Sequence, residues 1–343
     1  HQTRQQETQR QQQRSKDTES QQRPTPQQRR HQEEHKGNNN DNHSIRITFT
    51  MSEPDELYTL RAQFWLGHYG MALEEAKAVM RCPMSPALKS EREELALRCQ
   101  LGSGQNDKVI AAAQSSASPA IRALGLRAQF DMMDEAGKQG LVPQLHTMLG
   151  DGVTPSVQLT AAHVFLASGM KKEALQCVHE GQTMEHKCLA LQIYLQIDRL
   201  DLAQSELATM KRMDEDSVLS QLGSVYIALA TGSSMAKEAV HTLNQLSEQY
   251  GPSTFLLNLM SCAYMSGEMY EAAFQQLEQA RTDFVADSDT LANMIVCSQH
   301  LGKPVAPLIQ QLKTQYPSHF MVKGLEMVEG AFEREAIKYK VTA

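Results

Sequence analysis

The sequence predicts an all-α fold in which about eight helix pairs stack into a solenoid that ends in a capping helix. Three observations predict this class: similar segments recur about every 35 residues, apolar residues recur at steps of three and four, and Ala, Leu, Met and Gln outnumber Val and Ile. Steps of three and four follow one face of a helix, and this composition favours helices over sheets.

Residues 1–50 differ in composition from the rest of the chain. They contain 12 Gln, nine Lys or Arg and six Asp or Glu, with almost no large apolar residues. Such a segment cannot bury enough apolar surface to fold, so we expect it to be disordered. Met51 is the first Met and opens MSEPDELY, which reads as a protein start. Residues 1–50 are thus either a tail or an upstream segment without a role, and the folded domain is expected at 51–343.

The repeat is clearest when LLNLMSCAYMSG (256–267) is compared with LANMIVCSQHLG (291–302). Leu, Asn, Cys and Gly recur between them at an offset of 35. A fixed offset of this length is typical of proteins whose repeated units stack on their neighbours. Turns of the array are predicted at the glycines that continue the series, namely Gly67, Gly102, Gly137, Gly169, Gly232, Gly267 and Gly302. Between Gly169 and Gly232, where the series lacks a Gly, the polar segment IDRLD (197–201) is the predicted turn.

Each turn joins two apolar-periodic segments, such as VQLTAAHVFLAS (157–168) and MKKEALQCVHE (170–180). The helix pairs are expected between residues 53 and 316, and SHFMVKGLEMVEGAFEREAIKY (318–339) is expected to cap the array. Ser, Thr and Asp favour helix starts because their oxygens accept hydrogen bonds from free N–H groups, and Pro favours the first helical position. Such starts stand at Ser85-Pro86, Ser118-Pro119, Thr154-Pro155, Asp216-Ser217 and Asp287-Ser288.

Helix pairs at a period of 34–35 residues are typical of tetratricopeptide repeats, and LGSVY (222–226) matches the L-G-x-x-Y element of that repeat. A single pair cannot bury its apolar face, so neighbouring pairs stack into a solenoid with a concave surface. The sequence therefore predicts a tetratricopeptide-like binding scaffold.

Two segments resemble catalytic motifs without meeting their requirements. SQHLGKP (298–304) contains a Gly-Lys pair, but a helix is expected before it and Pro follows the Lys, so a turn between helices is predicted. HEGQTMEH (179–186) has Thr183 where the metalloprotease motif H-E-x-x-H needs its second His. Neither segment predicts a catalytic site.

Three further segments are interpreted as helix connections. In LGSGQNDK (101–108), Asp stands where a dinucleotide-binding loop needs its third Gly. The acidic runs DED (214–216) and DSD (287–289) lack the Gly of a calcium loop. We therefore expect no enzyme activity, no cofactor and no metal.

Composition narrows the class of partner. Residues 51–343 hold 24 Lys or Arg and 34 Asp or Glu, and this excess of acid argues against nucleic-acid binding. No apolar run approaches the ~20 residues of a membrane span. The spacing of the six cysteines favours reduced, buried thiols over a zinc site or a disulfide framework, and they stand at Cys82, Cys99, Cys177, Cys188, Cys262 and Cys297.

The chain resembles the coatomer epsilon subunit family in four segments. They are DELYTLRAQFWLGHYGMALEEAKAV (55–79), DRLDLAQSELATMKRMDEDSVLSQL (198–222), ALATG (228–232) and IVCSQHLGKP (295–304). Coatomer is the vesicle coat of Golgi-to-ER and intra-Golgi transport, and the resemblance covers about 53–340. It implies a non-catalytic, curled solenoid that binds the C-terminal region of the coatomer alpha subunit and stabilises the coat. It also implies a cytoplasmic protein that meets the rest of coatomer indirectly and joins Golgi membranes and coated vesicles only through the assembled coat.

A groove along the first helices of the pairs is the predicted interface. Residues 13, 10, 6 and 3 before a turn Gly share one helical stripe. The alternative function is a tetratricopeptide adaptor that docks chaperone or other C-terminal peptides. Such an adaptor needs cations on this stripe, and Lys89 and Arg92 on the stripe before Gly102 leave this alternative possible. Partner-binding residues are predicted at Thr254, Leu257, Ser261, Tyr264, Ala292, Val296 and Gln299.

Two substitutions follow from this register. Leu257 and Tyr264 are expected to face the groove, so replacing both by Asp should abolish binding and leave the fold intact. Leu259 is expected to face the neighbouring helix of its own repeat, so Leu259→Asp should be severely destabilising.

Overall fold

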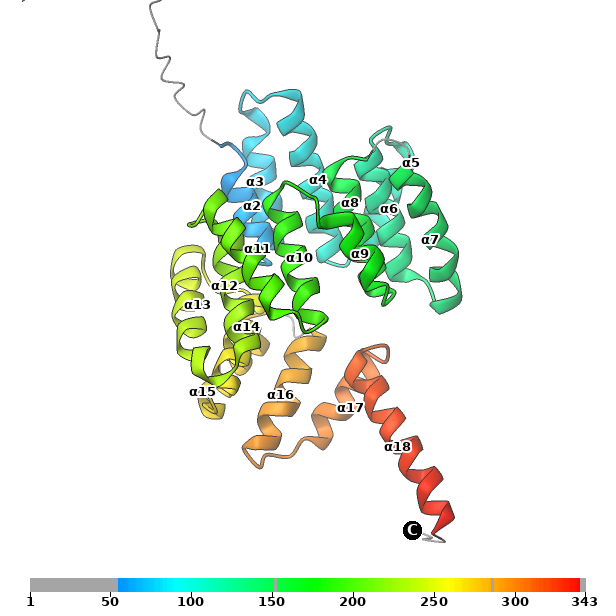
Figure 1. Ribbon diagram of the computed structural model, residues 1–343, viewed down its shortest axis with the longest axis vertical. Coiled ribbons are helices and arrows are strands. Elements are labelled where there is room, and N and C mark those ends of the chain that lie inside the picture. Colours follow the sequence, from blue (N-terminus) through cyan, green and yellow to red (C-terminus); the bar gives the residue numbers. More distant parts are fainter. Residues whose placement is uncertain (1–54, 151–152, 285–286, 340–343) are drawn as a thin grey trace, which may run out of the picture. The chain divides into compact units, whose positions relative to one another are not determined.

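Pairs of antiparallel helices joined by short turns make up the described chain (Figure 1). The computed structural model describes residues 55–150, 153–284 and 287–339, and residues 1–50, which are expected to be disordered, lie outside these ranges. The described residues form seventeen α-helices and two 3-10 helices, without a strand. The predicted all-α class, with eight helix pairs and a capping helix, is confirmed.

The first four pairs occupy residues 58–178. They are α2 (Tyr58–Trp65) with α3 (Tyr69–Ala78), α4 (Pro86–Gly102) with α5 (Asn106–Ser115), α6 (Pro119–Met132) with α7 (Glu135–Gly150), and α8 (Pro155–Ala167) with α9 (Lys171–Val178). A 3-10 helix, η1 (Val79–Arg81), follows α3.

The second four pairs and the capping helix α18 (Phe320–Lys338) complete the array. A second 3-10 helix, η2 (Ser233–Met235), precedes α13. The pairs are α10 (Met184–Gln196) with α11 (Leu200–Met213), α12 (Val218–Thr231) with α13 (Ala236–Tyr250), α14 (Thr254–Ser266) with α15 (Tyr270–Asp283), and α16 (Ser288–His300) with α17 (Ala306–Gln315).

The predicted helix starts are confirmed, and most have the side-chain bond that explains them. Ser85 Oγ accepts from the Leu88 N–H at 3.3 Å, and Asp287 Oδ1 accepts from the Thr290 N–H at 2.7 Å. Ser118 also precedes a helical Pro, but its side chain makes no such bond. The cap therefore stabilises α4 and α16 more directly than α6.

SQHLGKP forms the predicted turn. Helix α16 ends at His300, and Gly302 adopts φ +67°, a left-handed conformation that is strained for other residues. Gly67, Gly169, Gly232 and Gly267 also lie at turns, as predicted. The predicted series is wrong at Gly102, which is the last residue of α4, and at Gly137, which lies inside α7. At two turns the left-handed residue is not Gly but Asp198 or Glu268.

The array curls so that its first helix meets its later pairs. Ala62 and Leu66 of α2 are 1% and 0% exposed, and they share one apolar cluster with Leu222 of α12 and Leu256 of α14. The Ser253 hydroxyl, just before α14, donates to the Leu66 carbonyl at 2.6 Å. These contacts bring the first pair onto the sixth and seventh.

Candidate partner-binding cavity

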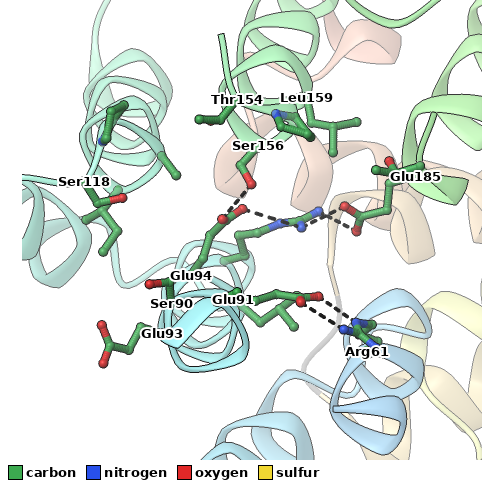
Figure 2. Close-up of a pocket in the computed structure, with 18 of the residues that line it drawn as sticks. Arg61, Ser90, Glu91, Glu93, Glu94, Ser118, Thr154, Ser156, Leu159 and Glu185 are labelled. Carbon is green, nitrogen blue, oxygen red and sulfur yellow. Dashed lines mark hydrogen bonds and ion pairs between the residues drawn. The ribbon is translucent and has the colours of Figure 1, made fainter. Parts of the chain in front are cut away.

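The first helices of the early pairs surround a cavity of about 770 Å³. Its walls come from α2 and α4 and from the starts of α6, α8 and α10, as Figure 2 shows for Arg61, Ser118, Ser156 and Glu185. The face of α4 that lines the cavity, with Ser90, Glu94 and Arg98, is not the predicted concave stripe that holds Lys89 and Arg92. The size of the cavity is sufficient for several side chains of a bound segment.

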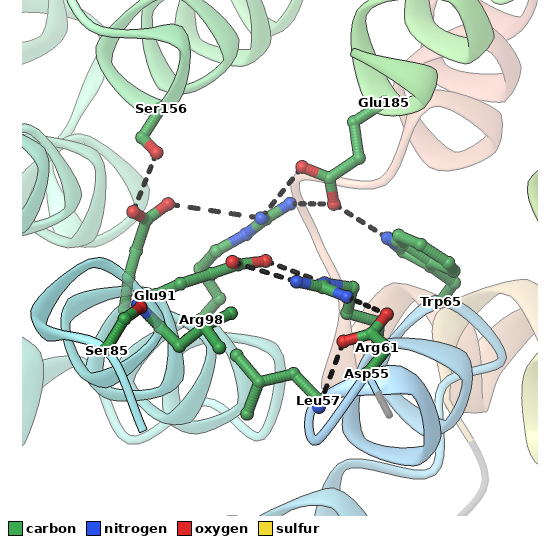
Figure 3. Close-up of polar contacts among 11 residues, drawn as sticks. Asp55, Leu57, Arg61, Trp65, Ser85, Glu91, Arg98, Ser156 and Glu185 are labelled. Atoms are coloured by element: carbon green, nitrogen blue, oxygen red, sulfur yellow. Dashed lines mark hydrogen bonds and ion pairs between the residues drawn. The ribbon is translucent and has the colours of Figure 1, made fainter. Parts of the chain in front are cut away.

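An ion pair between α4 and α10 forms one wall of the cavity (Figure 3). The Arg98 guanidinium donates to both oxygens of Glu185, at 2.9 and 3.0 Å. The Trp65 indole N–H of α2 donates to Glu185 Oε1 at 2.7 Å. Bidentate Arg–carboxylate pairs are both strong and directional, so these bonds fix the relative positions of α2, α4 and α10.

A second ion pair and a hydroxyl contact extend this network. Arg61 of α2 donates to Glu91 of α4 at 2.7 and 2.9 Å, and Ser156 at the start of α8 donates to Glu94 Oε2 at 2.7 Å. The side chains lining the cavity include two arginines, Arg61 and Arg98, and four glutamates, Glu91, Glu93, Glu94 and Glu185. The cavity therefore carries an excess of acid.

Two of these carboxylates have pKa values shifted in opposite directions, although burial favours a higher pKa at both. Burial raises the pKa of Glu94, and its bond from Ser156 and the nearby Arg98 only partly offset this rise. Burial also favours a raised pKa at Glu185, but the charge and hydrogen bonds of Arg98 outweigh it and the pKa is lowered. Glu185 is thus held as an anion opposite Arg98.

The described residues hold neither a candidate metal centre nor a membrane span. Across the described part of the chain, no group of three or more His, Cys, Asp or Glu side chains is placed to hold a metal ion. Every helix described is too short or too polar to cross a bilayer. The cavity combines ion pairs, hydroxyls and apolar carbon, a mixture suited to a protein segment.

The predicted partner-binding stripe lies outside this cavity, and several of its residues are buried. In α14, Leu257 is 2% exposed and Ser261 is fully buried, and in α16, Ala292 is 5% exposed. The expectation that Leu257 lies open in a groove is wrong. The remaining members of the stripe are accessible to differing extents: Thr254 and Tyr264 are half-buried, and Val296 and Gln299 are exposed.

Close packing of α14 on α16 accompanies this burial, and Ala292 shares an apolar cluster with Leu312 of α17 and Val322 of α18. Asn258 of α14 donates to Thr290 Oγ1 at 2.8 Å and accepts from Asn293 Nδ2 at 2.9 Å. The two first helices thus satisfy each other's polar groups beside the stripe. Tyr264 also packs against apolar clusters, so the premise that Leu257 and Tyr264 face away from neighbouring helices is wrong, and replacing both by Asp is expected to destabilise the fold. Partner binding by the exposed residues stays a prediction.

Trp65, Arg98 and Glu185 were not predicted as site residues, although the sequence holds a weak indication of part of the site. Glu91, Glu94 and Arg98 stand at i, i+3 and i+7, on one face of α4, and Trp65 is the single Trp of the chain. Their convergence on Glu185 could not be predicted, since 87 residues separate Arg98 from it. Lys89 and Arg92, which kept the peptide-adaptor alternative open, do not line the cavity.

Comparison with known proteins gives consistent matches over the described array. Residues 53–340 match the family model of the coatomer epsilon subunit. The chain is 32% identical over 285 residues to coatomer subunit epsilon-2 of Arabidopsis thaliana, across 82% of this chain and 96% of the relative. It is 29% identical over 290 residues to coatomer subunit epsilon of Dictyostelium discoideum, across 81% and 97%.

A solved structure supports the fold alone. The Cut9–Hcn1 hetero-tetramer of the APC/C aligns with a TM-score of 0.54 and 14% identity, across 77% of this chain and 54% of that chain.

Proposed function

This chain belongs to the coatomer epsilon subunit family, and on that premise we propose that it holds the C-terminal region of the coatomer alpha subunit in the cavity between its early helix pairs. Its role in the coat is structural and non-catalytic. The cavity formed by five first helices carries this proposal, because it is large, is lined by several pairs at once and mixes apolar carbon with charged groups.

The proposal extends to transport and location. As a coat subunit the protein would serve retrograde Golgi-to-ER and intra-Golgi transport, from the cytoplasm and the cytosolic face of Golgi membranes and coated vesicles. It would meet the membrane and the other coatomer subunits through the assembled coat. The matches to coatomer epsilon subunits over most of the chain support this role.

The chemistry of the cavity disfavours the adaptor alternative. A site for free C-terminal carboxylates needs unpaired cations, whereas Arg61 and Arg98 are both paired with glutamates here. A segment with basic or neutral polar side chains fits the acid excess better than a carboxylate does.

Affinity capture tests the proposed role. The full chain is immobilised and exposed to cytosol, and the captured proteins are identified by mass spectrometry. Recovery of the coatomer alpha subunit at a stoichiometric level supports the proposal. Recovery of chaperones without coatomer subunits would favour the adaptor alternative and overturn it.

A further inference from the structure

The first helix pair closes the array through contacts that a linear solenoid does not have. In a linear array each repeat contacts only its neighbours. Here the Ser253 hydroxyl bonds the Leu66 carbonyl across 187 residues of sequence, and the Tyr58 and Tyr250 hydroxyls lie 3.4 Å apart. We call this set of contacts between α2 and the pairs from α10 to α14 the seam.

Glu185 is the point at which the seam meets the cavity (Figure 3). Its carboxylate accepts from Trp65 of the first pair and from Arg98 of the second, although Glu185 itself begins the fifth. The side chains of Arg98 and Glu185 are 17% and 20% exposed, so water competes little for these bonds. Trp65 also packs against the clusters around Leu222 and Leu191.

The cavity wall depends on the seam. Arg61 and Trp65 line the cavity from α2, and Glu185 lines it from α10. Three helix pairs separate α2–α3 from α10 along the chain. The walls that α2 and α10 contribute to the cavity therefore contact each other only through the seam. On the other side, Arg61 holds α2 to Glu91 of α4, next to the extended link at residues 82–85. That link joins the first pair to the second.

We propose that the α2–α3 pair is a strap that closes the cavity around the bound segment, and that Glu185 is the positioning residue that keeps the strap shut. The inference rests on the proposed function and adds how the partner is retained. A segment enclosed by the strap leaves when the strap lifts. Loss of the Glu185 anchor should therefore act mainly on the dissociation rate.

Trp65 fluorescence reports on the position of the strap, because Trp65 is the single Trp of the chain. In the free protein, Glu185→Ala should shift the Trp65 emission to longer wavelength and increase its quenching by acrylamide. The complex with the purified C-terminal region of the alpha subunit should dissociate about tenfold faster, since a bond to a charged group is lost. Glu185→Gln keeps an acceptor for the indole N–H and should recover part of the loss.

Two further variants separate the strap from direct contact with the partner. Glu93 lines the same cavity from α4, with a side chain that is 60% exposed, so Glu93→Ala is the matched control and should leave Trp65 emission unchanged. Trp65→Phe removes the indole N–H and keeps an aromatic body. It should speed dissociation as Glu185→Ala does, and the double variant should be no faster than the faster single one, because both break one bond.

Circular dichroism melting checks that each variant is folded. If Glu185→Ala is unfolded, the dissociation rate of the Trp65→Phe complex tests the strap instead. Unchanged emission in Glu185→Ala, unchanged dissociation, or additive effects of the two substitutions would overturn the strap. Failure of the wild-type chain to bind would instead overturn the proposed function, and the inference with it. Wild-type binding together with unchanged variant kinetics would overturn the inference alone.

Discussion

At the scale of single residues, burial controls the chemistry of the cysteines. Cys99 is fully buried and Cys188 is 4% exposed, and burial raises the pKa of each thiol to about 12. A free thiol has a pKa of about 8.5. These two residues therefore remain neutral, apolar parts of the core rather than nucleophiles, as the sequence pattern predicts for the cysteines.

The raised thiol pKa values predict a loss of stability at alkaline pH. Above about pH 8.5 the unfolded chain releases thiol protons that the folded chain keeps, so the unfolded state binds fewer protons and the free energy of unfolding falls. The contribution is fully present below pH 8.5 and is lost as the pH rises towards 12. Urea unfolding at pH 7.5 and 10 measures this fall, and Cys188→Ala should reduce it. Equal stability at the two pH values would contradict the prediction.

Close approach of two helices depends on Gly125 of α6. A Cβ at this position would lie 2.2 Å from the Ala113 Cβ of α5, whereas Gly140 of α7 has open space around it. Gly125→Ala should therefore destabilise by about 1–3 kcal/mol through overpacking. The matched Gly140→Ala should stabilise by up to about 1 kcal/mol, because Ala favours a helix interior. Denaturant unfolding compares the two, and a neutral Gly125→Ala would show that α5 and α6 separate easily.

At the scale of the helix, local chemistry explains where most elements begin. Ser85 and Ser118 both precede a Pro at the first helical position, but only Ser85 accepts a bond from the first turn. The backbone ψ also differs, at 155° for Ser85 and 123° for Ser118. Sequence alone could predict both helix starts and could not distinguish their strength.

This pair of serines gives a matched test of helix capping. Ser85→Ala should lower the free energy of unfolding by about 1 kcal/mol, because the Leu88 N–H loses its acceptor. Ser118→Ala should change it by far less, since no cap bond is lost. Chemical denaturation of the two variants beside the wild type measures the difference. An equal loss in both would mean that the serine backbone conformation, rather than the cap bond, stabilises the helix start.

At the scale of the whole molecule, the repeat and its curl were predictable, and the residues that the curl brings together were not. The 35-residue period, the helix starts and the SQHLGKP turn arise from neighbouring residues, which sequence patterns record directly. The seam and the cavity arise from a small rotation added at every pair, so Trp65 meets Glu185 across 120 residues without a local signal. Burial of Leu257 and Ser261 depends on how tightly α14 packs on α16, which the helical stripe alone does not give.

Composition leads to a prediction for residues 1–50. A Gln-rich segment with few apolar residues cannot contribute to a core, so removing it should leave the melting temperature and partner binding unchanged. Thermal melting of the truncated and full chains is the measurement. A melting temperature several degrees lower in the truncated chain would show that this segment stabilises the array.

Binding of the purified C-terminal region of the alpha subunit to the wild type and to a cavity-blocking variant tests the central claim most directly. Ser90 is exposed and lines the cavity from α4, so Ser90→Arg adds bulk there without removing a core contact. Ser205 of α11 is an exposed helical serine away from the cavity and gives the matched Ser205→Arg control. In isothermal titration, the wild type and Ser205→Arg should bind equally, and folded Ser90→Arg should bind at least about tenfold more weakly. Equal binding by all three proteins, or no binding by the wild type, would contradict an alpha-subunit site in this cavity.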